Sequence, residues 1–318
     1  MITRTLRLAA HALQIAALCS TNQFLLAGSF SLSPTASTVT RSVARIIMSE
    51  APQELDTPQG VSSTALFMGQ GVRTRGLEQR REGATPTEGG MTLYLKAAED
   101  GTSAGDCPFA HYVRLILEEK NLPYSVRPCA SADDKPSWLL EHYEGKMPCL
   151  RHRKEAYVES NVIAAYLDYF FPFDGVQNTP ERKASTAAAE AAMDGFFPGV
   201  AGYLKDTDSD ASAGAESSEK LENLRSKLSG LNEHLSSNPG NNLDGTSHFG
   251  ILDCRLVPQL YHLSVGIERF KGAHGKPDLA TEFPAVHDYL QRAMDRESFQ
   301  KTQYSPDTIE WGWGNARK

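Results

Sequence analysis

The stretch Gly105-Asp106-Cys107-Pro108-Phe109 places a thiol directly ahead of a predicted helix. Behind it, apolar residues recur at helical spacing from Phe109 to Leu117. Pro108 suits the first helical position, where its missing N–H costs nothing. Cys107 therefore falls at the N-cap, where free N–H groups and the helix dipole stabilise an anion. The pattern predicts a thiol of lowered pKa and hence a reactive thiolate, the alternative being a small buried apolar residue.

The chemistry of this thiol is limited by its neighbours. The position three after Cys107 is Ala110, so the motif has no second cysteine and a second thiol must come from a small molecule. His111 lies on another side of the helix from Cys107, and we expect it to be structural. A cysteine protease is disfavoured because no His or Asn lies in a recognisable pairing. The five cysteines of the chain are unevenly spaced and form neither a disulfide framework nor a zinc-ligand set.

Composition excludes several classes of partner. The chain has 318 residues, enough for two modest domains. Its net charge of -7 and pI near 5.7 argue against binding to nucleic acid or to anionic membrane surfaces. The helix after Cys107 carries Arg114, Glu118, Glu119 and Lys120, which is too much charge for stable membrane insertion.

The first 90 residues differ from the rest. Residues 1–49 contain no Asp or Glu, and Arg4 and Arg7 precede an apolar run, which is typical of a targeting leader. The stretch 27–34 resembles the bipartite plastid leader of algae with complex plastids, so we expect a plastid location. A mitochondrial presequence and a cytosolic form starting at Met48 are the alternatives. Residues 50–90 are polar with little periodicity, which predicts a disordered linker.

From residue 91 the order of predicted elements is βαβ followed by ββα. The expected elements are strand 91–95, helix 108–121, strand 123–127, a short helix at 133–140, strands 145–150 and 156–158, and helix 161–171. This order predicts an α/β thioredoxin-like domain (βαβαββα) over residues 91–172. In such domains the bond of a Met-Pro pair before the third strand is cis. We therefore expect a cis bond at Met147-Pro148, which turns the backbone of Met147 toward an extended peptide ligand.

Residues 173–318 predict an all-helical domain. The expected helices are 180–203, 216–236, 250–266, 283–294 and a short one near Glu297. Two loops are also predicted, a solvated hairpin turn at 151–154 and a polar loop at 205–215.

Several motifs together resemble the glutathione transferase superfamily, and within it the dehydroascorbate reductases, from Leu93 to the C-terminus. The resemblance rests on Gly-Asp-Cys-Pro-Phe at 105–109, Leu-Glu-Glu-Lys at 117–120 and Asp-Lys-Pro-Ser-Trp at 134–138. Later segments at 256–263, 270–271 and 297–302, and the tail Trp311-Gly312-Trp313, also resemble the family. The resemblance implies the glutathione transferase fold.

The resemblance also assigns roles to residues. Cys107 would be the nucleophile, with Asp106 as a polar neighbour and Lys96 facing the site from the loop after the first strand. The glutathione-binding residues that it implies are Lys135, Met147, Pro148, Glu159 and Ser160. Of these, Glu159 would hold the γ-glutamyl amine, and Ser160 would cap a helix that receives the γ-glutamyl carboxylate.

The chain departs from the family pattern at three positions. Glu159 stands where Asp is usual, and Ala110 where Ser or Cys is usual. Gly250 stands where the family has a Ser that caps the central helix of the second domain. We expect this change to leave Asp253 without its capping-box partner, at a cost of only a few tenths of a kcal/mol.

The implied activity is glutathione-dependent reduction of dehydroascorbate by a single cysteine, through a sulfenate and a mixed disulfide, with glutathione as cosubstrate and no metal or organic cofactor. A monomer is expected. Two alternatives stay open: an omega-like glutathione thioltransferase, and a non-enzymatic protein similar to the chloride intracellular channels.

Overall fold

A computed structural model describes the chain over residues 63–66, 72–75, 90–153, 155–173, 179–207, 219–271 and 276–318. It divides into two units, one made of residues 1–89 with 151–158 and the other of 90–150 with 159–318. The predicted leader, residues 1–49, lies outside the described residues, as does most of the predicted loop at 205–215.

The first unit contains short antiparallel strands. β1 (Ser63–Leu66) pairs with β2 (Val72–Arg75), and β2 pairs with β6 (Glu155–Val158). β1 and β2 lie within residues 50–90, where the sequence indicates a disordered linker, so the structure has two strands where none is expected. The predicted solvated turn at 151–154 is wrong for His152, which is a buried strand residue; Arg153, with φ 58°, makes the turn.

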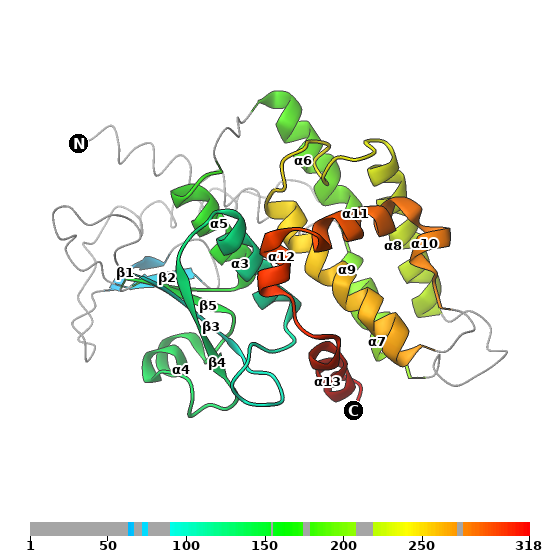
Figure 1. Cartoon of the computed structure of the whole chain (residues 1–318). Helices are drawn as coiled ribbons and strands as arrows, with labels where there is room; N and C mark the ends of the chain where they lie inside the picture. The colour runs from blue at the N-terminus through cyan, green and yellow to red at the C-terminus, as the bar shows by residue number, and fades with distance from the viewer. Residues whose placement is uncertain are drawn as a thin grey trace, which may run out of the picture. The chain divides into compact units, whose positions relative to one another are not determined.

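The second unit begins with a parallel strand pair. β3 (Met91–Lys96) pairs with β4 (Tyr124–Cys129), with Met91 opposite Tyr124 and Lys96 opposite Cys129. The crossover between them is α3 (Pro108–Glu119). The remaining elements of this part of the chain are α4 (Ser137–Tyr143), β5 (Cys149–His152) and α5 (Ser160–Phe170). The chain order β3-α3-β4-α4-β5-β6-α5 confirms the predicted βαβαββα (Figure 1).

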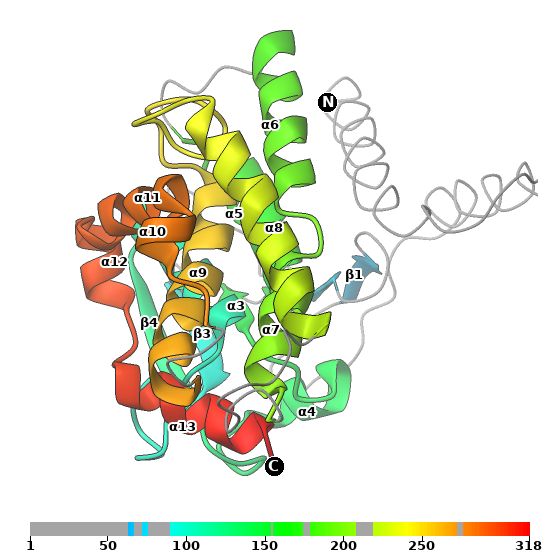
Figure 2. The same ribbon diagram turned by 90° about the vertical axis from the view of Figure 1, so that its right-hand side faces the viewer.

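The helical part follows α5. Its helices are α6 (Pro180–Ala192), α7 (Phe196–Lys205), α8 (Glu219–Ser236), α9 (Ile251–Phe270), α10 (Leu279–Glu282), α11 (Pro284–Met294), α12 (Glu297–Thr302) and α13 (Pro306–Ala316). The single helix predicted at 180–203 is two helices, because Gly195 adopts a left-handed φ of 68° between them. α7 and α8 run side by side (Figure 2). α10 and α13 lie outside the helices predicted from the sequence.

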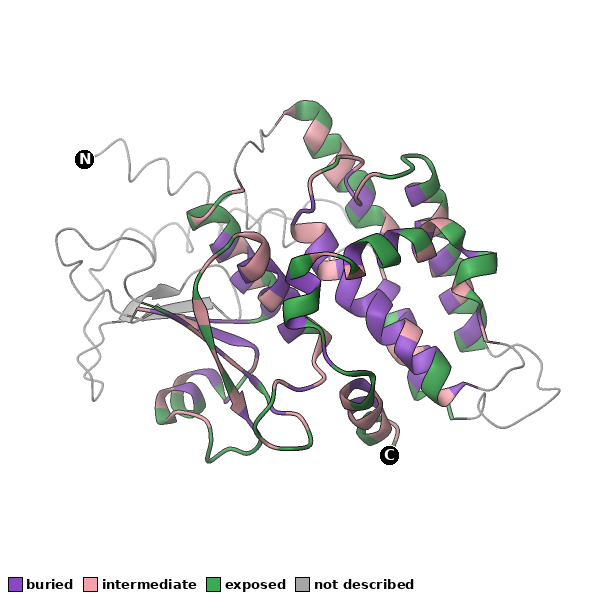
Figure 3. Ribbon diagram, viewed as in Figure 1, coloured by how far each residue is buried: buried purple, intermediate pink, exposed green. Residues whose placement is uncertain are grey.

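α9 is the centre of the helical part. Most of its residues from Asp253 to Ile267 are buried, as its colouring in Figure 3 shows. It packs against α3, α7, α11 and α13, so the helix that begins at Cys107 rests on the core of the helical part. This contact gives α3 a rigid support.

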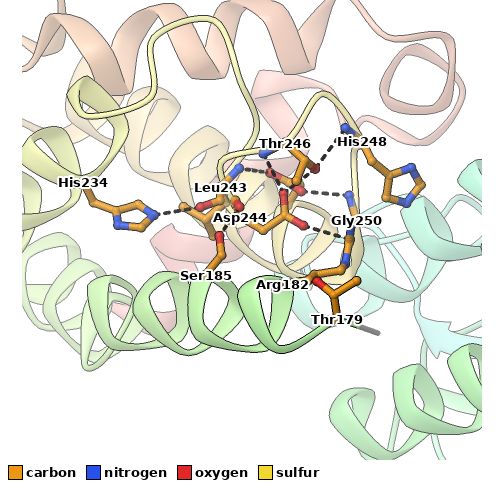
Figure 4. A network of polar contacts seen from close by, with 10 residues as sticks. Thr179, Arg182, Ser185, His234, Leu243, Asp244, Thr246, His248 and Gly250 are labelled. Atoms are coloured by element: carbon orange, nitrogen blue, oxygen red, sulfur yellow. Dashed lines mark hydrogen bonds and ion pairs between the residues drawn. The ribbon is translucent and has the colours of Figure 1, made fainter. Parts of the chain in front are cut away.

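The start of α9 is held by Asp253 rather than by a side chain at position 250. The backbone N–H of Gly250 donates to Oδ2 of Asp253 at 2.8 Å, and the N–H of Leu243 donates to Oδ1 at 2.8 Å. The expectation that Asp253 lacks its partner is therefore wrong, because this half of the capping box uses the backbone of Gly250. Figure 4 shows the loop that precedes α9 and its contacts with α6, among them the ion pair between Arg182 and Asp244 at 2.8 Å.

Candidate active site

Cys107 occupies the N-cap of α3, as the sequence predicts. Its φ and ψ are -79° and 114°, and its carbonyl oxygen accepts the first helical hydrogen bonds, from the N–H groups of Ala110 at 3.1 Å and His111 at 3.0 Å. Among the cysteines in the part of the chain that the structure describes, Cys107 is half-buried and the other three are buried. Cys107 is therefore the thiol within reach of a substrate.

The predicted lowering of the pKa of Cys107 is wrong. The N–H groups of Ala110 and Phe109 and the ammonium of Lys96 do lower this pKa, as a helix N-terminus should. Burial, helped by the carboxylate of Asp106, outweighs them and raises the pKa of the thiol above its ordinary value. The thiolate at neutral pH is therefore a minor form.

The rate at which iodoacetamide alkylates Cys107 should depend strongly on pH. The rate constant for iodoacetamide at Cys107 should rise about tenfold per pH unit between about pH 7 and pH 8.5, because below the pKa the thiolate fraction grows in that proportion. Peptide mass spectrometry at each pH gives the rate at each cysteine, and Cys129, Cys149 and Cys254 should react far more slowly because they are buried.

Asp106→Asn is the matched variant for this measurement. It removes a negative charge beside the sulfur, so it should lower the pKa of Cys107 and speed alkylation at pH 7 severalfold. A rate at Cys107 that stays level from about pH 6.5 to pH 8.5 would show that the pKa is lowered after all.

Lys96 and Asp106 form an ion pair beside Cys107. Nζ of Lys96 lies 2.6 Å from Oδ1 of Asp106, and it also lies 4.8 Å from the centre of the Trp311 ring of α13. Lys96 remains exposed, so its ammonium can still reach a bound ligand. The two predicted neighbours of the thiol are thus brought together, and the C-terminal helix contributes Trp311 beside them.

Gly312 packs directly against Asp106. A Cβ atom added at Gly312 would lie 1.9 Å from Oδ2 of Asp106 and 2.4 Å from its Cβ, far inside contact distance. Only a residue without a side chain allows α13 to approach Asp106 this closely. Gly312 therefore sets the position of the carboxylate that borders Cys107.

Gly312→Ala should displace Asp106 and break its ion pair with Lys96. We expect a loss of about 1–3 kcal/mol in unfolding free energy, together with a change in the alkylation rate of Cys107. Gly314→Ala is the control, because a Cβ at Gly314 of the same helix meets nothing within 4 Å. It should be neutral or stabilising by up to about 1 kcal/mol. Equal effects of the two substitutions in thermal unfolding would refute the close contact.

Lys135, Met147 and Pro148 lie on the turns around α4 and before β5. Nζ of Lys135 donates to the carbonyl oxygen of Gly145 at 2.9 Å, close in sequence to Met147. The Met147-Pro148 bond is cis, which confirms that prediction. Pro148 is buried, whereas Met147 keeps part of its surface exposed.

Glu159 and Ser160 lie at the start of α5. Their positions at the helix N-terminus differ from those expected by one residue. Glu159 is the N-cap, exposed and with φ 70°, and no side chain caps the helix. Ser160 is the first helical residue and is buried, so the prediction that it caps the helix is wrong. A positive φ at a residue other than Gly costs of order 1–3 kcal/mol, and Glu159 adopts it directly before the first turn of α5.

Comparisons with known proteins agree with this arrangement. The family models for the glutathione S-transferase N-terminal and C-terminal domains match residues 106–169 and 214–292. The probable glutathione S-transferase DHAR1, cytosolic, of Oryza sativa subsp. japonica is 32% identical over 227 residues, which cover 70% of this chain and 97% of that protein. This chain belongs to the glutathione transferase family.

Two further relatives of this glutathione transferase are informative. The glutathione S-transferase DHAR3, chloroplastic, of Arabidopsis thaliana is 30% identical, over 66% of this chain and 73% of that protein. Dehydroascorbate reductase of Chlamydomonas reinhardtii, known from a crystal structure, is 30% identical in sequence to this chain. The two structures superpose with a TM-score of 0.57 over 71% of this chain and 97% of that one. The predicted fold, a thioredoxin-like domain followed by a helical domain, is confirmed, and glutathione is a substrate of the family.

The C-terminal segment after α12 contributes to the site in a way that the sequence does not predict. The hydroxyl of Tyr304, between α12 and α13, donates to the carbonyl oxygen of Cys107 at 3.3 Å. Trp311 and Gly312 belong to the tail that resembles the family, and the structure adds that they are neighbours of Lys96 and Asp106. No local pattern could indicate these contacts, because they join residues about 200 positions apart.

His111 is structural in this transferase, as expected. It is fully buried, and its Nε2 lies 3.1 Å from Oγ1 of Thr302, which itself donates to the carbonyl oxygen of Ser298 at 2.8 Å. Nε2 of His111 is therefore the donor. Burial lowers the pKa of His111 well below its ordinary value, so the ring is neutral and does not serve as a base for Cys107.

Two other kinds of site are missing from the described part of the chain. It contains no group of three or more His, Cys, Asp or Glu side chains arranged to hold a metal ion. None of its helices combines the length and the apolar character that crossing a membrane requires.

Proposed function

We propose that this glutathione transferase reduces dehydroascorbate with glutathione, using Cys107 as its only catalytic thiol. The observation that carries the proposal is the half-exposed thiol at the N-terminus of α3, bordered by the ion pair of Lys96 and Asp106. Support also comes from the Chlamydomonas reinhardtii dehydroascorbate reductase, which is 30% identical to this chain.

The proposed catalytic cycle has three steps. The Cys107 thiolate, dehydroascorbate and one water give Cys107 sulfenic acid and the ascorbate monoanion, so the sulfur loses two electrons and the substrate gains them. The sulfenic acid condenses with one glutathione thiol to a mixed disulfide and water. A second glutathione thiolate attacks the glutathione sulfur, which releases glutathione disulfide and restores the Cys107 thiolate. In the first step the exposed ammonium of Lys96 stabilises the negative charge that develops on the ascorbate oxygens.

Glutathione is proposed to bind along the turns on either side of β5 and β6. Lys135 would hold its glycyl end, and the backbone of Met147, before the cis Pro148, would pair with its cysteinyl backbone. Glu159 would accept the γ-glutamyl ammonium. The N–H groups in the first turn of α5, at Ser160, would bind the free α-carboxylate of the γ-glutamyl residue, since a helix N-terminus favours anions.

The raised pKa of Cys107 is compatible with this chemistry. A thiolate of higher pKa is a better nucleophile, which offsets part of the loss from its lower population at neutral pH. The turnover rate should therefore increase from neutral to mildly alkaline pH, in step with ionisation of Cys107.

Steady-state kinetics of the full chain tests the proposal. Glutathione with dehydroascorbate should give rapid turnover, and glutathione with hydroxyethyl disulfide should give a much lower rate. The reverse order would favour the omega-like thioltransferase, and no rate with either substrate would favour a non-enzymatic protein. Light scattering should give the mass of a monomer.

A plastid location is proposed from the acid-free leader and from its resemblance to bipartite plastid leaders. A fluorescent fusion of residues 1–60 should enter the plastid of an alga with a complex plastid. A signal confined to mitochondria or cytosol would refute this part of the proposal.

A further inference from the structure

The carbonyl oxygen of Cys107 accepts three hydrogen bonds. Two come from the N–H groups of Ala110 and His111 and belong to any helix start. The third comes from the hydroxyl of Tyr304, which is 197 positions away. Because the next residue is Pro108, the peptide between 107 and 108 has no N–H, and this carbonyl is its one polar group. Tyr304 therefore holds the Cys107 peptide at the one point where a hydrogen bond can do so.

Tyr304 is itself held firmly. Its side chain is 3% exposed, and its ring centre lies 5.0 Å from that of His111 and 6.3 Å from that of His262. Its backbone carbonyl accepts a hydrogen bond from the hydroxyl of Tyr261 of α9 at 2.8 Å. The hydroxyl that reaches Cys107 thus projects from a ring fixed against the core of the helical part.

The segment that carries Tyr304 is also tied to the first turns of α3. Nη1 of Arg114 donates to the carbonyl oxygen of Thr302 at 2.7 Å, and Nη2 donates to that of Lys301 at 3.2 Å. His111 donates to the hydroxyl of Thr302, as described above, and α12 packs on α3 (Figure 1). These contacts hold the end of α12 in a fixed position against the start of α3. The hydrogen bond from Tyr304 to Cys107 therefore has a fixed geometry.

We propose that Tyr304 is a positioning residue for Cys107, whose hydroxyl fixes the N-cap backbone and so aims the sulfur at the N–H groups of Phe109 and Ala110. This inference rests on the proposed role of Cys107 as the nucleophile. The orientation of an N-cap side chain depends on the φ and ψ of its own residue, which here are -79° and 114°. Burial raises the pKa of the Cys107 thiol, and the two N–H groups lower it. If the Cys107 backbone were looser, the N–H groups would lower the pKa less, and the pKa would rise further.

Tyr304→Phe in the full chain tests this role, because it removes the hydroxyl and keeps the ring. The measured quantity is the pH profile of alkylation of Cys107 by iodoacetamide. We expect the pKa of Cys107 to rise by up to about one unit, which would lower its alkylation rate at pH 7.5 by about threefold to tenfold. The carbonyl of Cys107 keeps two hydrogen bonds in this variant, so the fold should survive.

Tyr289→Phe is the matched control. It removes a buried hydroxyl of the helical part that donates to Asp253 and contacts neither Tyr304 nor Cys107, and it should leave the alkylation profile unchanged. Incorporation of 4-fluorophenylalanine at position 304 fills the space of the hydroxyl without an O–H donor and should show the same shift as Tyr304→Phe, which keeps the test valid if Tyr304→Phe does not fold.

Two results would overturn the inference. One is a Tyr304→Phe profile identical to that of the wild type, and the other is an equal shift in Tyr289→Phe, which would assign the effect to a general loss of stability. Since alkylation needs neither glutathione nor dehydroascorbate, the readout decides on Tyr304 whether or not the chain reduces dehydroascorbate. Failure of the proposed function would appear instead in the kinetics of the wild type.

Discussion

Replacing Cys107 by serine should reduce dehydroascorbate turnover by about a thousandfold or more, the size of loss that follows removal of an enzyme nucleophile. Serine keeps the shape of the side chain, but its hydroxyl neither ionises near neutral pH nor forms a disulfide. Glutathione should bind almost as well, because the residues proposed to hold it, among them Met147 and Glu159, are unchanged. Initial rates and calorimetric titration with glutathione measure the two effects separately.

Cys129→Ser is the control for this experiment. Cys129 is buried at the end of β4, and its sulfur donates to the backbone oxygens of Arg127 and Asp134. Its substitution should lower stability without abolishing turnover. A Cys107→Ser protein that kept even about a tenth of the wild-type rate would contradict the single-thiol mechanism, and Cys129 would then be the first thiol to test.

Asp253→Ala should cause a large loss of stability, about 3 kcal/mol or more. The Asp253 carboxylate is 1% exposed and accepts hydrogen bonds from the N–H groups of Leu243 and Gly250 and from the hydroxyl of Tyr289, each at 2.8 Å. Its removal leaves three buried donors without acceptors and frees the start of α9. Chemical unfolding monitored by circular dichroism measures the loss.

Asp307→Ala is the matched control, since the Asp307 carboxylate is exposed and its partner Arg269, at 2.8 Å, lies on the surface. Surface ion pairs contribute about 0–1 kcal/mol, so this variant should unfold almost as the wild type does. Equal losses in the two variants would show that the buried carboxylate has no special role.

The stability that depends on Asp253 should vary with pH. Burial is the largest influence on its carboxyl and raises its pKa to about 6, from 3.8. The folded chain therefore favours the protonated form, so this contribution to stability is complete below about pH 4 and is lost as the pH rises through about 6. The unfolding free energy of the wild type relative to Asp253→Asn should fall across that window. A difference that is constant with pH would contradict the raised pKa.

Local patterns in the sequence predict much of the fold. The spacing of apolar residues after Cys107 and the position of Pro108 place the thiol at the start of α3, and strand propensity places β3 and β4 on either side of that helix. These signals depend on neighbours within one or two turns, which is why they transfer directly from sequence to structure. The Met147-Pro148 bond is predicted through its place in the order of elements.

The environment of the site depends on contacts that no local pattern records. The pKa of Cys107 is raised because burial, which depends on the whole fold, exceeds the effect of the helix terminus. Tyr304 and Gly312 reach Cys107 and Asp106 from the far end of the chain. Gly250 fills its capping role through its backbone, so substituting the usual Ser does not remove the partner of Asp253.

The central claim is that one thiol carries the reaction through a disulfide with glutathione. Incubation of the full chain with dehydroascorbate and a single equivalent of glutathione, followed by acid quenching and peptide mass spectrometry, tests it most directly. The prediction is a mass increase of one glutathione less two hydrogens on the peptide that contains Cys107, absent from Cys107→Ser. An adduct on the peptide of Cys129, Cys149 or Cys254, or turnover with no adduct on any peptide, would contradict it.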